Sequence, residues 1–156
     1  MPSGAALDAD FLRKLGLKPG GRLGVVRAPD GWAEALEKLT PTDASASLAR
    51  ARRADVILAW LTPKDDLRKV FSALERKIPP NGAVWAVIPK KSALSKGEAA
   101  VEWKDMQAAG LASGRLVDNK ELRFDDRYYG TRFVVRVAAR PQTGARPGPS
   151  GRKDRR

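Results

Sequence analysis

The chain has 156 residues, of which 30 are Lys or Arg and 18 are Asp or Glu, so its formal net charge is +12. It contains no histidine and no cysteine, which excludes disulfides, thiolate chemistry, Cys/His zinc sites and the Ser-His-Asp triad. At this length one domain buries about 68 to 70% of the surface of its unfolded chain, so a core can form without cross-links.

The first third of the chain predicts an arm followed by three elements. Residues 1–9 are predicted to be a flexible N-terminal arm, and residues 10–15 a short helix. Residues 22–27 contain a short apolar run between turn residues, which is typical of a buried strand. A helix is predicted after the turn, because apolar side chains recur at i, i+4 and i+7 in Trp32, Leu36 and Leu39.

The middle of the chain predicts two strands and a helix. Residues 44–49 contain few bulky apolar side chains and predict at best an edge strand, whereas residues 55–61 leave no polar face and predict a buried strand. Thr62 as the cap, Pro63 at the first helical position and Asp65 in place of the Glu of a capping box predict the start of a helix, which must end before Pro79.

The last third predicts a buried strand at residues 83–88 and a helix that begins at Ser95, with Glu98 completing a capping box. Trp103 and Met106 are predicted to face inward from this helix. Two final strands are predicted at 116–124 and 131–137, and their short connection predicts an antiparallel hairpin.

This order of elements is typical of the α/β class. We expect residues 10–139 to form a three-layer Rossmann-like sandwich, with a mostly parallel sheet that is closed by an antiparallel C-terminal hairpin. The start of the chain lacks the features of a secretory signal, and the longest apolar runs are far shorter than the roughly 20 residues that span a membrane. A cytoplasmic protein without membrane contact is the expectation.

Ligands of open α/β sheets bind beyond the carboxyl ends of the strands. That rule selects four groups of residues: Asp30 with Gly31, Thr62, Lys90 with Lys91 and Ser92, and Asp125 to Tyr129. Cations and carboxylates there suit an anionic small ligand or a protein partner. No catalytic residue and no metal ligand set is identified. The predicted ligand-binding residues are Asp30, Gly31, Lys90, Lys91, Ser92, Asp125 and Asp126.

The signatures of nucleotide-type cofactors are absent from the first loop. Dinucleotide folds place G-x-G-x-x-G after the first strand, whereas this chain has Pro29 and a single glycine, Gly31, at that point. No acidic residue is available after the second predicted strand, where Arg50, Arg52 and Arg53 occur instead and are interpreted as solvated surface charges. No cofactor is therefore predicted, with S-adenosylmethionine as the alternative.

Residues 140–156 hold six basic residues and one acid among prolines and glycines, without an aromatic side chain. Such a segment buries too little apolar surface to offset its ordering entropy, so it is predicted to be a disordered basic tail. The tail is interpreted either as a solubilising end or as a weak contact to nucleic acid.

Six short motifs in order resemble a bacterial family of small Rossmann-like proteins that is classified only as a domain of unknown function. They are Leu15-Gly16-Leu17-Lys18-Pro19-Gly20, Ala28-Pro29-Asp30-Gly31, Asp55-Val56-Ile57-Leu58, Pro89-Lys90-Lys91-Ser92, Leu116-Val117-Asp118-Asn119-Lys120 and Arg132-Phe133-Val134-Val135-Arg136. The chain is also similar in outline to class I S-adenosylmethionine-dependent methyltransferases, through the Pro80-Asn81-Gly82 turn and the closing hairpin. The resemblance implies a fold and assigns no activity.

Three functions follow as hypotheses. The first is a non-catalytic Rossmann-like domain that binds an anionic small ligand or a protein partner at the carboxyl edge of the strands. The second is a divergent S-adenosylmethionine-dependent methyltransferase, in which Asp30 contacts the cofactor and Asp125 or Asp126 positions the acceptor. The third is association with nucleic acid through residues 140–156.

Overall fold

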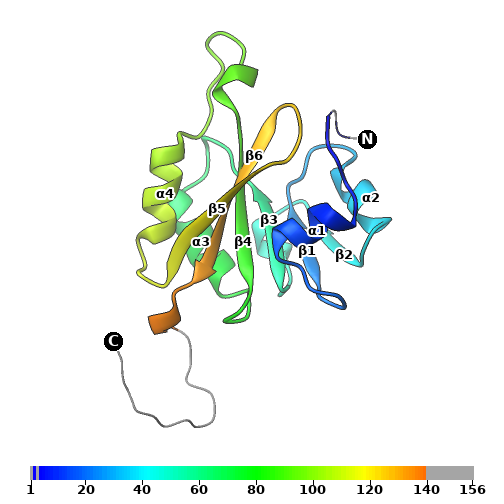
Figure 1. Cartoon of the computed structure of the whole chain (residues 1–156). Coiled ribbons are helices and arrows are strands. Elements are labelled where there is room, and N and C mark those ends of the chain that lie inside the picture. Colours follow the sequence, from blue (N-terminus) through cyan, green and yellow to red (C-terminus); the bar gives the residue numbers. More distant parts are fainter. Residues whose placement is uncertain (1, 3, 140–156) are drawn as a thin grey trace.

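The computed structural model describes residues 2 and 4–139 of the chain, which form an α/β sandwich around one six-stranded sheet (Figure 1). The predicted tail, residues 140–156, lies outside the described residues. The helices are α1 (Ala9–Leu15), α2 (Trp32–Glu37), α3 (Leu67–Glu75) and α4 (Trp103–Leu111), with 3₁₀ turns at Leu48–Arg50, Lys91–Ala93 and Val137–Ala139. The strands are β1 (Leu23–Val26), β2 (Thr42–Ser45), β3 (Val56–Trp60), β4 (Ala83–Pro89), β5 (Leu116–Arg123) and β6 (Tyr128–Val135).

The strand order of the sheet is β2-β1-β3-β4-β6-β5. The first four strands pair in parallel, and β6 is antiparallel to both of its neighbours. The predicted edge strand, parallel sheet and closing hairpin are all confirmed, and so is the α/β three-layer Rossmann-like class. The central strands β3 and β4 are buried almost throughout, because helices cover both faces of the sheet.

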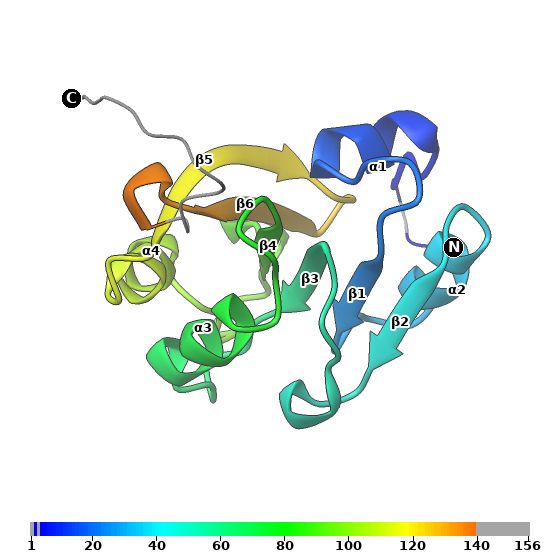
Figure 2. The same ribbon diagram turned by 90° about the horizontal axis from the view of Figure 1, so that it is seen from below.

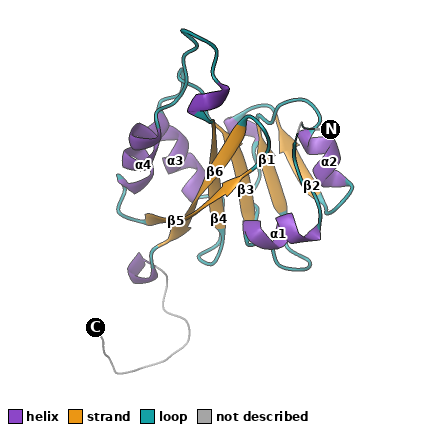
Figure 3. Ribbon diagram, turned by 45° about the horizontal axis from the view of Figure 1, so that its top comes forward, coloured by secondary structure: helices purple, strands orange, loops and turns teal. Residues whose placement is uncertain are grey.

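Two pairs of helices cover the two faces (Figures 2 and 3). Helices α1 and α2 bury Phe11, Leu15, Trp32 and Leu36 against one face, while α3 and α4 bury Phe71, Leu74 and Met106 against the other. Ala5 and Leu7, within the segment predicted to be an N-terminal arm, pack on the α1/α2 face. Among the described residues, no helix is both long and apolar enough to cross a membrane.

The α1/α2 face holds a cluster of aromatic rings. Phe124 at the end of β5 lies with its ring centroid 5.3 Å from Phe11, 5.5 Å from Trp32, 5.8 Å from Trp60 and 5.9 Å from Trp85. Tilted and edge-on contacts of this kind add about 0.5 to 1.5 kcal/mol each to the area that the rings bury. The cluster therefore ties the β5–β6 hairpin to the helices α1 and α2 and to the strands β3 and β4.

Helix α3 begins later than the sequence indicated. Asp66 is its N-cap and accepts a hydrogen bond from the Lys69 N–H, whereas residues 62–65 form a turn. The prediction that Thr62 caps the helix was wrong. Asp65, which was expected to complete a capping box inside that helix, instead turns its carboxylate back onto the N–H and hydroxyl of Thr62 and onto Arg27.

The predicted start of a helix at Ser95 was also wrong, although half of its capping box forms and Trp103 and Met106 pack inward from α4 as predicted. The Ser95 N–H donates to Glu98 Oε1 at 2.9 Å, but Gly97 adopts φ of 78°, a left-handed conformation that ends a helical turn. The chain then remains irregular until Glu102, the N-cap of α4. Leu39, predicted on the inner face of α2, is exposed because α2 already ends at Glu37.

Gly110 of α4 lies against the Phe133 ring of β6, and this contact generates a stability prediction. A Cβ at Gly110 would stand 2.8 Å from Cζ of Phe133, a fully buried ring. Gly110→Ala improves helix propensity by about 1 kcal/mol, but overpacking of a core contact removes about 1 to 3 kcal/mol. We expect a net loss of stability in urea unfolding.

Phe133→Leu supplies the matched background for this substitution. Leucine at position 133 makes room for the new methyl group, so Gly110→Ala should be neutral or stabilising there. Equal destabilisation in both backgrounds would contradict the assigned clash.

Candidate functional site

The connections around β1 and β3 reverse direction at the carboxyl edge of the sheet. From β1 the chain passes through α2 to β2, which lies on one side of β1 in the sheet. From β3 it passes through α3 to β4, which lies on the other side of the β1/β3 pair, and α3 covers the face of the sheet opposite to α2. The loops after these two adjacent strands therefore separate, and such a point is where open α/β sheets leave a crevice for ligands.

An ion pair joins the two loops across this point. Arg27 Nη1 donates to Asp65 Oδ1 at 2.9 Å and Nη2 donates to Asp65 Oδ2 at 3.0 Å, a bidentate arrangement. Arg27 directly follows β1 and adopts φ of 59°, a conformation that costs a non-glycine residue about 1 to 3 kcal/mol. Its N–H also donates to the Ser45 carbonyl at 2.8 Å, so backbone and side chain are both fixed.

The Asp65 carboxylate is the centre of this arrangement. Besides Arg27, it accepts the Thr62 N–H at 2.8 Å and the Thr62 hydroxyl at 3.3 Å. Partial burial acts to raise the pKa of Asp65, but the hydrogen bonds from Arg27 and Thr62 outweigh it and hold that pKa below the ordinary value of 3.8. The carboxylate is therefore charged at neutral pH.

A pocket of about 370 Å³ lies beside the ion pair, between the ends of β1, β3 and β4 and the β5–β6 hairpin. Its walls are largely apolar or aromatic, from Trp60, Leu61, Pro63, Pro89, Ala99, Ala100, Val101 and Tyr128. Arg27, Thr62, Glu98 and Arg127 supply its polar groups. Apolar walls with a few polar groups are typical of small-molecule sites.

Two N–H donors at this pocket have no partner among the described residues. They are the indole Nε1 of Trp60, a side chain that is only 4% exposed, and Nε of Arg27. A buried donor without an acceptor costs about 1 to 3 kcal/mol, so native structures rarely leave one. The other three indoles do find acceptors, in Asp125, the Leu15 carbonyl and Thr131. Trp60 is therefore the exception, and it lines a pocket.

Arg127 and Glu98 form the outer side of the pocket. Arg127 Nη2 bonds Glu98 Oε2, its Nη1 donates to the Ala93 carbonyl at 3.1 Å, and its guanidinium lies 5.6 Å from the centroid of the Tyr128 ring. The Ser95 N–H and the Arg127 guanidinium hold the pKa of the Glu98 carboxyl below its ordinary value. These contacts fix the loop after β4 against the hairpin.

The two predicted aspartates of the hairpin differ in their roles. Asp125 is buried, and its Oδ1 accepts the N–H groups of Arg127 and Tyr128 at 2.8 and 2.7 Å while Oδ2 accepts Trp32 Nε1 at 3.2 Å. Its carboxylate thus organises the turn and attaches it to α2. Asp126 is exposed and pairs with Arg123 at 2.6 Å.

The other predicted residues lie around the pocket. Asp30 is exposed, and Gly31 adopts φ of 90° as the N-cap of α2. The Lys90 N–H donates to the Arg127 carbonyl at 2.8 Å, while Lys91 and Ser92 are exposed and Lys91 lies 3.7 Å from Glu102. All seven predicted residues are at the carboxyl edge and all are described, but none is among the residues that line the pocket.

The residues that do line it are close neighbours in sequence. Pro29, Pro89 and Arg127 each adjoin a predicted residue, so the pocket lies within one or two positions of the residues that the rule selected. Arg27 and Trp60 were missed because they lie within predicted buried strands, Arg27 as the last residue of one and Trp60 next to the last residue of the other. A charged or hydrogen-bonding side chain at or next to the end of a buried strand was the available signal. Within residues 2 and 4–139, no three His, Cys, Asp or Glu side chains gather to hold a metal.

Comparison with solved structures places the fold among S-adenosylmethionine-dependent methyltransferases. N-methyltransferase NodS from Bradyrhizobium japonicum WM9 superposes with a TM-score of 0.54 at 11% identity, over 81% of this chain and 93% of that chain. A TehB-like SAM-dependent methyltransferase from Corynebacterium glutamicum gives 0.53 at 7% identity, over 81% and 86%. NodS in complex with S-adenosyl-L-homocysteine gives 0.51 at 12% identity, over 81% and 84%. No protein-family model and no curated protein matches the sequence.

Removing the Asp125 carboxylate tests its structural role. Asp125→Ala leaves the Trp32 indole N–H and two backbone N–H groups without an acceptor, so we expect a loss of about 2 to 3 kcal/mol in urea unfolding. Asp126→Ala, at the exposed neighbouring position, should change stability by less than about 0.5 kcal/mol. Similar losses in the two variants would contradict the assignment.

The Asp65 carboxylate gives a pH-dependent prediction. Its folded-state pKa is below 3.8, so its stabilisation is complete above about pH 5 and is lost as the pH falls through the folded-state pKa. Asp65→Asn should therefore lower the free energy of unfolding by about 1 kcal/mol at pH 7 and by clearly less at pH 3.

The control is Asp30→Asn, an exposed carboxylate in the neighbouring loop that removes the same charge. Chemical denaturation of both variants and the parent at the two pH values supplies the measurement. An Asp65→Asn effect that is equal at pH 3 and pH 7 would disprove the assigned role of the ionised carboxylate.

Proposed function

We propose that this protein is a non-catalytic small-molecule-binding domain with a methyltransferase fold, and that its ligand binds in the pocket beside Arg27 and Trp60. The observation that carries the proposal is the pair of buried N–H donors without acceptors, Arg27 Nε and Trp60 Nε1, which belong to two residues that line the same pocket. Because both atoms are buried, a ligand oxygen reaches either donor only when its side chain turns toward the pocket, and the hydrogen bond then removes a penalty that the protein otherwise retains.

The similarity of the fold suggests S-adenosylmethionine as a ligand. The residues at the carboxyl ends of β1 and β3, however, lack the features by which folds of this type bind nucleotide-like cofactors. Phosphate- and nucleotide-binding turns rely on glycines and backbone N–H groups, whereas the loop after β1 carries side chains at Arg27 to Asp30 and lacks an N–H at Pro29. The guanidinium of Arg27 and the carboxylate of Asp65 bridge the crevice itself. The segment after β2, residues 46–54, contains no carboxylate to hold ribose hydroxyls.

The charges of the pocket support binding rather than acid–base catalysis. Glu98 and Asp65 both have pKa values below their ordinary range because arginines and N–H groups stabilise their ionised forms. A general base works best with a pKa near the operating pH, and the chain has no histidine to supply one. The two carboxylates thus serve to fix Arg27 and Arg127.

The composition of the walls defines the ligand class. Apolar and aromatic side chains surround the pocket, and its arginines are each paired with a carboxylate, so the pocket has almost no net charge. This environment suits a small ligand with an apolar or aromatic body and one carboxylate or carbonyl group. The acceptor oxygen would lie against Trp60 Nε1 and Arg27 Nε.

A second candidate is a divergent S-adenosylmethionine-dependent methyltransferase. It is favoured by the likeness of the fold, which extends over 81% of this chain and 93% of NodS. Methyl transfer depends mainly on proximity and alignment, so the missing histidine does not argue against it. Binding of the cofactor in this case requires the Arg27–Asp65 pair to open.

Nuclear magnetic resonance of the indole N–H groups tests the first proposal. Four tryptophans give four indole cross-peaks, of which Trp32, Trp85 and Trp103 already have acceptors in the protein. Titration with benzoate and benzamide, which share a ring and an acceptor oxygen, should shift the Trp60 indole signal and leave those of Trp85 and Trp103 in place. Trp60→Phe assigns the signal by deleting it.

Arg27→Lys serves as the matched variant, because it keeps the charge and removes the guanidinium Nε. It should weaken binding of both compounds by about tenfold, which is the loss of one hydrogen bond of about 1.4 kcal/mol. A Trp60 signal that stays unmoved by millimolar benzoate and benzamide counts against the ligand class. Titration with S-adenosylmethionine forms a separate arm, in which shifts of Ala28, Gly31 and Trp60 would favour the methyltransferase.

A further inference from the structure

The loops at the amino ends of the parallel strands carry a net charge of +8, which exceeds the net charge of +7 that all described residues carry together, 24 basic and 17 acidic. These segments contain nine basic residues and one acid, Asp55, and they lie at the lower edge of the sheet in Figure 1. We call these segments the amino edge. The amino edge consists of the residues between each helix or 3₁₀ turn and the strand that follows it, together with Arg136 after β6. The segments are 16–22, 38–41, 51–55, 76–82 and 112–115.

The opposite edge is electrically balanced. The loops that follow the carboxyl ends of β1, β3, β4 and β5 contain six basic and seven acidic residues, and Arg27, Lys91 and Arg127 are paired there with carboxylates. The amino edge thus has a net charge of +8 against −1 for the carboxyl edge. The separation of charge follows the direction of the strands and is not a general feature of the surface.

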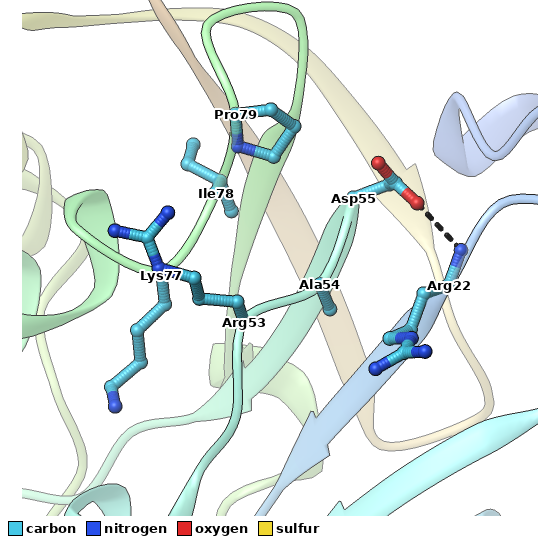
Figure 4. Close-up of a pocket in the computed structure, with 7 residues that line it drawn as sticks. All are labelled: Arg22, Arg53, Ala54, Asp55, Lys77, Ile78 and Pro79. Atoms are coloured by element: carbon cyan, nitrogen blue, oxygen red, sulfur yellow. Dashed lines mark hydrogen bonds between the residues drawn. The ribbon is translucent and has the colours of Figure 1, made fainter.

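A groove of about 280 Å³ lies in the middle of the amino edge (Figure 4). Arg22 stands on one side of it and Arg53 and Lys77 on the other. The single carboxylate of the edge, Asp55, is engaged by the Arg22 backbone N–H at 2.7 Å. Arg22 also lies 3.9 Å from Asp43, and Lys77 donates to the Ala51 carbonyl at 2.6 Å. The net positive charge of the groove nevertheless acts on whatever approaches this edge from solvent.

The basic residues form a row rather than a point. In sheet order they belong to the loops before β2, β1, β3 and β4, to Arg136 after β6 and to Arg115 before β5. Six strands at about 4.8 Å spacing extend this row over about 24 Å. A linear polyanion with closely spaced phosphates matches such a row, since duplex DNA carries one charge per about 1.7 Å.

We infer that the amino edge binds the phosphate backbone of duplex nucleic acid. No aromatic residue occurs in the segments of the edge, so stacking on unpaired bases, which single-strand binders use, has no residue to perform it here. Contacts to phosphates alone give binding that is independent of sequence and strongly dependent on salt. The six basic residues of 140–156 follow the same edge in sequence, and the folded edge is a second, separate contributor.

Fluorescence anisotropy with the full-length chain and a labelled 24-base-pair duplex of mixed sequence provides the test, at salt concentrations between 50 and 200 mM. Arg53→Gln with Arg76→Gln removes two cations of the amino edge. We expect the slope of log affinity against log salt to fall by about two. The loss of affinity between 50 and 200 mM should accordingly become about tenfold smaller.

Lys64→Gln with Lys96→Gln is the matched control, because it removes two exposed cations from the loops of the carboxyl edge. An unchanged slope in this variant supports the inference, whereas an equal fall in both variants attributes binding to net charge and overturns it. Replacing the six basic residues of 140–156 by Gln completes the set. Loss of all duplex binding in that variant, with no effect of Arg53→Gln and Arg76→Gln, also overturns the inference.

Two further probes separate the alternatives. The single strand of the same sequence should bind more weakly than the duplex, because its charge density is lower and the edge has no rings to stack on its bases. Vesicles of phosphatidylglycerol that bind while the duplex does not would overturn the inference in favour of a membrane surface. None of these outcomes depends on the ligand of the carboxyl-edge pocket.

Discussion

The bidentate contact between Arg27 and Asp65 determines the shape of the carboxyl edge. It joins the loops after β1 and β3 at the point where the sheet would otherwise leave a crevice, and it holds Arg27 at a positive φ. The same carboxylate engages Thr62 and so delays the start of α3 to Leu67. Two charges that stabilise each other thus decide where a helix begins and which part of the edge stays open to a ligand.

The two edges of the sheet serve different physical purposes. At the carboxyl edge every arginine of the pocket is matched by a carboxylate, which leaves apolar walls and the unused donors of Arg27 and Trp60 as the basis of recognition. At the amino edge the loops hold nine cations and one carboxylate, and Asp43 and Glu75 of the flanking elements pair with two of these cations, so an excess of positive charge remains and long-range attraction dominates. In a parallel sheet the loops that lead from helices into strands all lie at the amino edge, and the loops that leave the strands all lie at the carboxyl edge. A difference in charge between these two sets of loops therefore becomes a difference in charge between the two edges of the sheet.

The architecture was predictable because buried strands and amphipathic helices repeat with different periods along the chain. Runs such as residues 56–60 and 83–88 have no polar face, and the connection of the last two strands is too short for anything but a hairpin. The start of α3 and the irregular stretch from 94 to 102 were not predictable. In these two segments the carboxylates of Asp65 and Glu98 bind neighbouring N–H groups, but they also bind Arg27 and Arg127, which are distant in sequence. Contacts of the second kind cannot be predicted from local sequence.

By itself the sequence determined the α/β class, the closing hairpin, the excess of cations and the absence of histidine and cysteine chemistry, since these follow from composition and from contacts between neighbouring residues. The location of the pocket depended on the tertiary structure. Asp125 illustrates the difference: its place in a turn marked it as a candidate ligand, but only the approach of Trp32 shows that its carboxylate is fully used within the protein. Whether a polar atom is left without a partner depends on the whole fold, because partners come from any part of the chain.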